Sequence, residues 1–156
     1  MNYWLFKSEP DEFGIDDLAA CKRERWDGIR NYQARNLLRD QVAVGDQVLL
    51  YHSSCKTVGV AGIAEVVKEA YPDPLQFDPD SKYFDPKSSP DNPRWISVDI
   101  AYVEKFPRVL PLASIKSNPQ LEEMVLVKQG RLSIQPVTAH EWQVILGMVN
   151  RGRTDA

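Results

Sequence analysis

The stretch "RWISVDIAYVEKF", Arg94 to Phe106, contains the clearest strand pattern in this chain. Its side chains form two alternating sets: Trp95, Ser97, Asp99 and Ala101 on one face, and Ile96, Val98, Ile100 and Tyr102 on the other. A period of two residues is that of a β-strand, because successive side chains of a strand point to opposite faces. The stretch therefore predicts one strand of a sheet.

Further strands and helices are expected on both sides of this stretch. Patterns of apolar residues predict strands over 3–6, 47–52, 58–72 and 131–137. Helical spacing predicts helices over 14–21, after Asn31, in short pieces over 110–129, and over 139–148 after Thr138. Gly59 and Gly62 indicate a bulge or a close backbone approach within their strand. These elements predict an α+β fold with about five strands, in which a curled sheet closes into a partial barrel.

Composition and charge restrict the class of protein. The chain has 156 residues, of which 43% are hydrophobic, which suits one domain with its own core. It lacks an apolar run of about 18 residues and a leader-like start, so an intracellular protein is expected. The expected location is the cytoplasm of a bacterium or, if the protein is eukaryotic, the nucleus. The net charge of −3 argues against a protein that coats nucleic acid by bulk electrostatics. Basic residues nevertheless cluster within 22–40 and 127–133, and carboxylates within 71–93, so a polyanion would meet one side of the molecule.

Several kinds of chemistry have no support in the sequence. It contains no glycine-rich loop for phosphates, so no nucleotide cofactor is expected. The two histidines, His52 and His140, do not form a metal-ligand pattern with either cysteine. No convincing set of nucleophile, base and orienting acid is present. We therefore expect neither a catalytic site nor a metal site.

The segment "RWDGIRNYQARNLLRD", Arg25 to Asp40, gathers planar and hydrogen-bonding groups around a helix start. Trp26 offers a stacking face, Gly28 permits close approach to the backbone, and Arg30 offers paired donors that suit a phosphate or a base edge. Each residue also has a structural interpretation, since Trp26 could belong to the core, Arg30 to a surface ion pair, and Asn31 to a helix cap. Together they favour a binding site without naming its ligand.

Five strings of the sequence occur in an order that resembles the EVE domain family. They are "YWLFKSEP", "WDGIRNYQARN", "GDQVLLYHSS", "GIAEVVKEAYPD" and "RLSIQPV". The resemblance covers about residues 1–148 as a single domain and leaves 149–156 as a tail that is expected to be frayed. It implies the fold of the PUA-like superfamily, a mixed β pseudo-barrel of about five to six strands flanked by short helices.

The resemblance also implies a function and a set of site residues. Family members are regarded as non-catalytic nucleic-acid-binding modules that read a modified base, such as methylated or hydroxymethylated cytosine, in DNA or RNA by holding one flipped nucleotide. In the implied site, Lys7, Ser8 and Glu9 form the mouth, and Trp26 forms a stacking wall. The floor and the groups that read the base edge are Gly28, Arg30, Asn31 and Tyr32, with Arg35 and Asn36 behind them. Ser53 adds a hydroxyl, and the far side consists of Arg131, Leu132, Ser133 and Gln135. Arg131 is expected near a phosphate, and Glu9 is expected to accept a hydrogen bond from an exocyclic amine.

Two other functions remain open on the sequence alone. The net negative charge is compatible with a pocket for a free nucleoside-like or other small ligand. An enzyme that modifies nucleotides is a weaker alternative, because no catalytic cluster is evident. The partner expected first is DNA or RNA with a modified base, and neither a membrane nor a particular protein partner is indicated. The salt dependence of binding distinguishes a nucleic-acid reader from a pocket for a small ligand, because binding to a polyanion weakens as salt is added.

Overall fold

A six-stranded mixed sheet forms the centre of the computed structural model, which describes residues 1–154, with side chains through residue 151. Its strands are β1 (Tyr3–Ser8), β2 (Arg23–Trp26), β3 (Gln47–His52), β4 (Gly59–Pro72), β5 (Ile96–Pro111) and β6 (Ile134–Val137). They lie in the order β2-β5-β4-β3-β1-β6, where β1 and β3 are parallel and all other neighbours antiparallel. The predicted α+β class is confirmed, but the sheet is open, with β2 and β6 at its edges, and does not close into a barrel.

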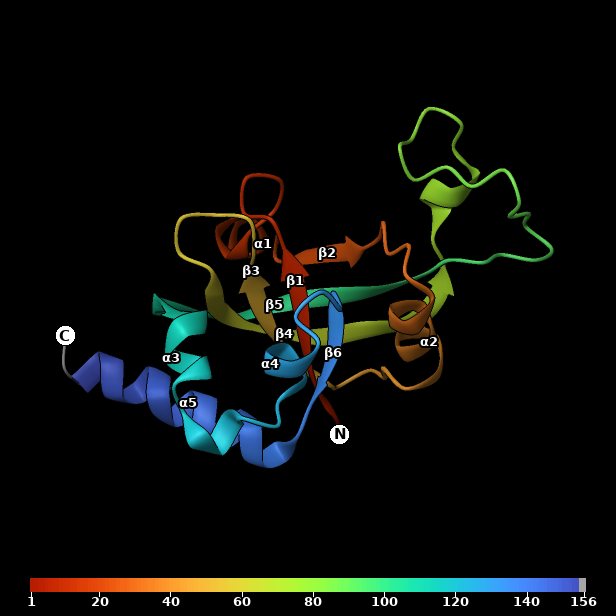
Figure 1. Ribbon diagram of the computed structural model, residues 1–156. Coiled ribbons are helices and arrows are strands. Elements are labelled where there is room, and N and C mark those ends of the chain that lie inside the picture. The colour runs from red at the N-terminus through yellow and green to blue at the C-terminus, as the bar shows by residue number, and fades with distance from the viewer. Residues whose placement is uncertain (155–156) are drawn as a thin grey trace.

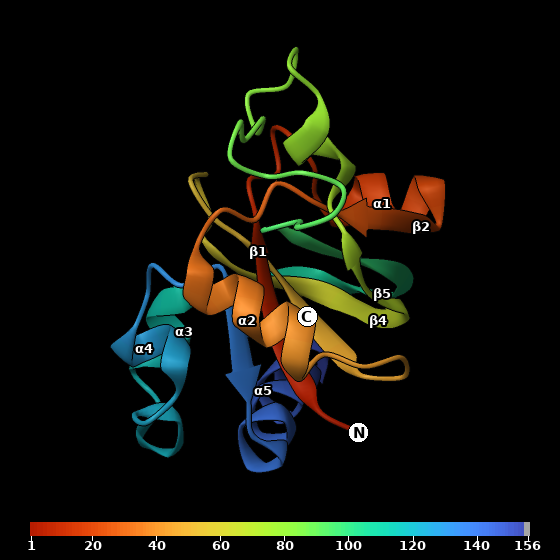
Figure 2. The ribbon, with the colours of Figure 1, turned by 90° about the vertical axis from the view of Figure 1, so that its right-hand side faces the viewer.

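Helices cover both faces of this sheet and create two cores (Figures 1 and 2). The helices are α1 (Ile15–Cys21), α2 (Tyr32–Asp40), α3 (Leu112–Lys116), α4 (Val125–Lys128) and α5 (Ala139–Thr154). The alternation within β1 explains the two layers, because Trp4 and Phe6 pack with α1 and α2, whereas Leu5 packs with α3 and α5.

The long strands β4 and β5 approach each other closely at two glycines. A Cβ atom at Gly59 would lie 2.0 Å from the carbonyl oxygen of Leu110, and one at Gly62 would lie 2.4 Å from that of Glu104. The register between the strands also shifts between Val60 and Gly62. The bulge and close approach predicted at these glycines are therefore confirmed.

The loop over residues 73–95 joins β4 to β5 and projects from the body of the molecule (Figure 1, upper right). It begins with a short 3₁₀ helix, Pro74–Phe77. The buried Gln76 closes its base: Oε1 accepts hydrogen bonds from the backbone of Arg94 and Trp95, and Nε2 donates to the carbonyls of Asp73 and Trp95. The loop is thus attached to the sheet at both of its ends.

Three features differ from the sequence-based expectations. The strand β2 was not predicted, and β5 continues beyond Phe106 to Pro111. The tail expected to be frayed, 149–156, continues α5 as far as Thr154, and residues 155–156 lie outside the described part. None of the helices described is both long and apolar enough to span a membrane.

Candidate functional site

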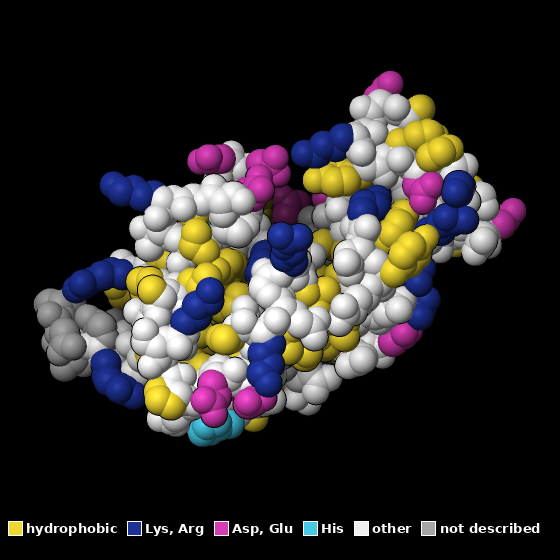
Figure 3. Space-filling model, viewed as in Figure 1, with side chains coloured by type: hydrophobic (Ala, Val, Ile, Leu, Met, Phe, Trp, Pro, Cys, Tyr) yellow, Lys and Arg dark blue, Asp and Glu magenta, His cyan; other side chains and the backbone are white. Residues whose placement is uncertain are grey.

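A cavity of about 750 Å³ opens where the carboxyl ends of β1 and β2 meet the loop 73–95 and the turn before β6. Figure 3 shows it as a hollow between the two upper lobes of the molecule, bordered by both acidic and basic side chains. Its lining consists of Lys7, Ser8, Glu9, Glu12, Phe13, Glu24, Arg25, Trp26, Asp27, Gly28, Ile29, Arg30, Ser53, Lys82, Tyr83, Gly130, Arg131 and Ser133. Five segments that are separate in the sequence, 7–13, 24–30, 53, 82–83 and 130–133, therefore share one site.

The fifteen residues expected at a site separate into two groups. Those that line the cavity are Lys7, Ser8, Glu9, Trp26, Gly28, Arg30, Ser53, Arg131 and Ser133. Those that do not are Asn31, Tyr32, Arg35, Asn36, Leu132 and Gln135. The first group comes from four of the five sequence strings on which the family resemblance rests.

Trp26 lines the cavity mainly as a buried residue. Its side chain is only 7% exposed and packs with Phe6 and Phe13, whose ring centres lie 5.9 and 6.1 Å away. A ring that is enclosed in this way has little free face, so Trp26 does not form the open stacking wall that was expected. The partly exposed aromatic rings of the cavity belong instead to Phe13 and Tyr83.

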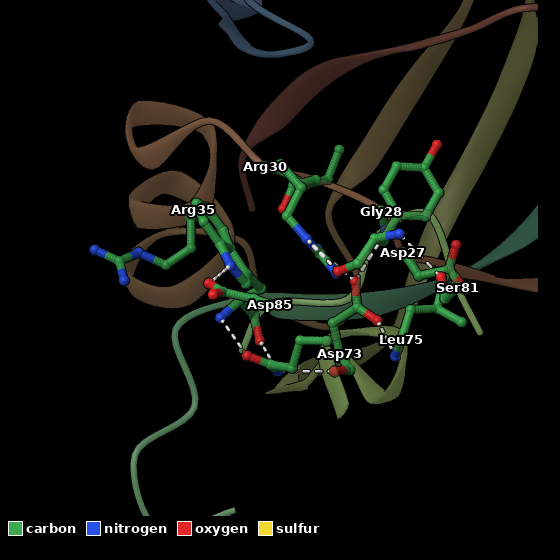
Figure 4. A network of polar contacts seen from close by, with 12 residues as sticks. Asp27, Gly28, Arg30, Arg35, Asp73, Leu75, Ser81 and Asp85 are labelled. Carbon is green, nitrogen blue, oxygen red and sulfur yellow. Dashed lines mark hydrogen bonds and ion pairs between the residues drawn. The ribbon is translucent and has the colours of Figure 1, made fainter. Parts of the chain in front are cut away.

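At Gly28 a side chain of the loop 73–95 lies so close to the backbone that only glycine fits. Its φ of +76° lies in the left-handed region, and a Cβ atom there would come within 2.9 Å of the Tyr83 ring. The Gly28 backbone N–H donates to Oδ2 of Asp73 at 2.8 Å (Figure 4). The group that lies close to the Gly28 backbone is thus the Tyr83 ring, at the place where a ligand had been expected.

Arg30 fastens the loop to the cavity wall. One guanidinium nitrogen pairs with the fully buried Asp73 at 2.9 Å, and Nε and Nη2 donate to the carbonyl of Tyr83 at 3.1 and 2.8 Å (Figure 4). Asp73 also accepts from the backbone N–H of Leu75. Most of the Arg30 donors are therefore occupied within the protein, which leaves this residue little capacity to read a base edge.

The residues at the start of α2 lie outside the cavity. Asn31 caps the helix, since its side chain accepts from the backbone N–H of Ala34 at 2.9 Å. Tyr32 is half exposed and packs on Trp95. Arg35 lies over the Tyr32 ring and donates to the Asn36 side chain. The structure thus places the polar half of this motif on an outer surface, not in the floor of the pocket.

Two predicted site residues of the "RLSIQPV" string, Leu132 and Gln135, are buried inside the protein. Leu132 is buried in the core on the α2 side of the sheet. Gln135 is fully buried, and its Nε2 donates to the carbonyl of Leu132 at 2.8 Å. Neither side chain belongs to the cavity lining, whereas those of Arg131 and Ser133 do.

Four carboxylates line the cavity, and three of them have partners. Glu12 pairs with Lys82 at 3.6 Å, Asp27 accepts from Nε of Arg25 at 2.8 Å, and Glu24 accepts from a backbone N–H. Within the described part of the chain, the Glu9 carboxylate has no ion-pair partner. Glu9 is exposed and therefore open to a ligand donor.

Basic side chains also line the cavity. Lys7 donates to the carbonyl of Gly130 and lies 5.2 Å from the centre of the Tyr51 ring. Burial lowers the pKa of the Lys7 ammonium from its usual value. Arg131 is exposed at the rim. The cavity lining thus contains both carboxylates and cations.

Sequence reasoning missed the cavity residues contributed by the loops. Phe13 lies three residues after the end of the "KSEP" string, so its apolar side chain in an otherwise charged turn was an available signal. Lys82 and Tyr83 belong to the loop 73–95, where no site residue was expected, and so does Asp73, which anchors this loop from outside the lining. No local pattern distinguishes these three from the loop's other polar residues.

Comparisons with known proteins identify the family. The model of the EVE domain matches residues 2–148. Thymocyte nuclear protein 1 of Homo sapiens is 43% identical over 166 residues, which cover 94% of this chain and 73% of the relative. A structure from Leishmania major has a TM-score of 0.94 and 49% identity, with 98% and 97% of the two chains covered. Human THYN1 in complex with 5-methylcytosine-containing DNA has a TM-score of 0.91 and 42% identity, with 96% and 98% covered. The chain belongs to the EVE domain family.

Proposed function

We propose that this protein is a reader of modified DNA, whose cavity holds one modified base, such as 5-methylcytosine, turned out of the double helix. The observation on which this rests is the likeness to human THYN1, whose structure contains 5-methylcytosine DNA and aligns with 96% of this chain. The match to the EVE domain, over residues 2–148, includes all the segments that line the cavity.

The size and polarity of the cavity support a base as its occupant. Its volume, about 750 Å³, lies within the range of about 300–1,000 Å³ that is common for ligand pockets. Cytosine presents an exocyclic amine, which carboxylates of proteins accept. Glu9 is the candidate acceptor, because the other cavity carboxylates already have partners. A methyl group on the cytosine ring leaves this amine free.

Aromatic rings of the cavity supply the stacking that a flipped base requires. Turning a base out of the helix costs a few kcal/mol, and stacking on an aromatic side chain returns roughly 1–3 kcal/mol. Phe13 and Tyr83 are both partly exposed within the lining, so each has ring surface to offer. The proposed reader would therefore use these two rings and not Trp26.

The cations at the rim suit the phosphates next to the bound base. Lys82 and Arg131 are both exposed there, whereas the carboxylates would repel a phosphate from the interior. The base would thus enter the cavity while its backbone stays at the edge. We propose binding without catalysis, since the cavity side chains suffice to hold and orient a base.

An equilibrium binding measurement tests this function. Duplex DNA with a single 5-methylcytosine, its unmodified twin and the free modified nucleoside are compared at low salt, for the natural protein and for Glu9→Gln. We expect the methylated duplex to bind tightest, and Glu9→Gln to weaken both duplexes about tenfold through loss of a charged acceptor. Glu122→Gln, which removes an exposed carboxylate outside the cavity lining, serves as the control.

The outcome separates this proposal from its alternatives. Binding of the free nucleoside with no preference for DNA would favour a small-ligand pocket. If the modified base were converted during incubation, as detected by mass spectrometry of the nucleosides, the protein would be an enzyme. Equal binding of the methylated and unmodified duplexes would refute the reading of this mark.

A further inference from the structure

A row of rings and guanidinium groups leads from the cavity wall to the outer surface of α2. The Arg30 guanidinium lies 5.3 Å from the centre of the Trp95 ring, which lies 4.8 Å from that of Tyr32. The Arg35 guanidinium follows at 4.9 Å from the Tyr32 ring. Because Arg30 lines the cavity and Tyr32 is 51% exposed, the row runs from the site to solvent.

Hydrogen bonds hold this row in place. The Trp95 indole is buried and donates to the Asp85 side chain at 2.8 Å. Arg35 donates to the carbonyl of Arg94 at 2.9 Å, which connects α2 to the base of the loop 73–95. The exposed part of Tyr32 is therefore a preorganised aromatic surface, with the guanidinium of Arg35 beside it.

The arginines of this surface differ from most others in the protein. Arg23, Arg25, Arg30 and Arg39 each form an ion pair with an aspartate. Within the described part of the chain, neither Arg35 nor Arg94 has a carboxylate within ion-pair distance. A guanidinium without a carboxylate partner keeps its charge available for an external anion such as phosphate.

We propose that Tyr32, Arg35 and Arg94 form a flanking surface that binds the sugar–phosphate backbone of the DNA strand next to the base in the cavity. Arg35 and Arg94 contact phosphates, and the Tyr32 ring packs against a sugar. Phosphates of one strand follow each other at about 3.4 Å along the helix axis, so a surface that begins at the cavity wall meets the nearest nucleotides. The inference rests on the proposed function and gives the outward-facing half of the motif a separate task.

The substitutions Arg35→Gln and Arg94→Gln test this surface. Each is measured with the methylated and unmodified duplexes over a range of salt concentrations. We expect each variant to bind both duplexes about three- to tenfold more weakly at low salt and to lower the salt slope by about 1. The ratio of affinities for the two duplexes should not change, because backbone contacts do not read the base.

Arg108→Gln is the matched control. Arg108 is exposed on β5 beside Met148 and Val149 of α5, away from the cavity, and no ion pair involves it among the described residues. The substitution Arg108→Gln removes the same charge and should leave both the affinity for DNA and its salt slope unchanged. An equal loss in this control would mean a general charge effect and would overturn the flanking surface.

The two proposals fail in different ways. Unchanged affinity and slope in both Arg35→Gln and Arg94→Gln would overturn the flanking surface while the methyl preference of the natural protein stands. A natural protein that binds both duplexes with the same salt slope but without any preference would overturn the reader function. Loss of the methyl preference in Arg35→Gln would place that residue in base recognition and overturn its backbone role.

Discussion

Trp26 shows how burial changes the role of a residue in a binding motif. Its ring is 7% exposed between Phe6 and Phe13, whereas Phe13 keeps a partly exposed face in the cavity. We expect Trp26→Ala to lower the free energy of unfolding by about 3–5 kcal/mol, because it removes a large buried side chain and leaves a cavity. Urea unfolding followed by circular dichroism measures this loss.

Phe13→Ala is the companion variant at this site. We expect it to cost less stability than Trp26→Ala and to weaken binding of the methylated duplex by roughly tenfold, since it removes one stacking surface. The interpretation would be wrong if Trp26→Ala kept the natural stability and lost binding. In that case the indole would serve the ligand and not the core.

His52 is a titratable residue that contacts the first residue of α1. Its Nε2 accepts from the backbone N–H of Ile15 at 3.1 Å, and burial lowers the pKa of the imidazole, with Lys105 also lowering it and Asp16 and Asp17 opposing. With a folded-state pKa below the unfolded value of 6.5, the unfolded chain takes up the proton first. The free energy of unfolding should therefore decrease as the pH falls from about 6.5 towards the folded-state pKa.

Unfolding in urea at several pH values between about 5.5 and 8 measures this dependence. His52→Gln keeps an acceptor that does not titrate, so the dependence should become shallower in this variant. His140→Gln serves as the control, because His140 is exposed at the start of α5. A natural protein and a His52→Gln variant with parallel profiles would exclude His52 as the titrating group.

Among the elements, the loop 73–95 acts as a wall of the site because one buried carboxylate holds it. Asp73 accepts from Arg30 and from the backbone N–H groups of Gly28 and Leu75. We expect Asp73→Ala to destabilise the protein by about 3 kcal/mol, because the Arg30 charge loses its buried partner. Hydrogen exchange should become faster across the loop, and binding of the methylated duplex should weaken as Tyr83 moves.

Asp91→Asn provides the comparison for this loop. Asp91 is an exposed residue of the same loop, and the substitution removes the same charge without touching the buried network. Its exchange pattern and binding should match those of the natural protein. If Asp73→Ala also left exchange in the loop unchanged, the ion pair with Arg30 would not be what holds the wall.

The elements also show what the sequence could reveal. The strand β5 and the helix α2 were predictable, because a period of two and an Asn cap are local signals. The strand β2 was not, since three residues of "RERW" are charged and its place at the sheet edge depends on pairing with β5. The contact of Tyr83 with Gly28 depends likewise on tertiary packing between distant segments. Motif strings therefore located the cavity but not the wall that the loop adds to it.

For the whole molecule, the balance of charge limits how DNA can be bound. The net charge is −3, yet within the described part of the chain Arg35, Arg94 and Arg131 have no ion-pair partner, and Arg131 lines the cavity. Bulk attraction cannot supply most of the affinity, so the few local phosphate contacts and the base pocket must share it. Unmodified DNA should accordingly bind only modestly more weakly than methylated DNA, since both duplexes can place a base in the cavity.

The salt dependence of binding tests this division. Each phosphate contact contributes about −0.9 to the slope of log K against log salt, so a few contacts predict a slope of about −2 to −4. Burial of one methyl group adds about 0.8 kcal/mol, a preference of about fourfold that does not involve ions. The lines for methylated and unmodified duplexes should therefore be parallel and separated by this factor. A slope steeper than about −6 would require many more phosphate contacts than the rim offers, and converging lines would mean that the methyl preference depends on the backbone contacts.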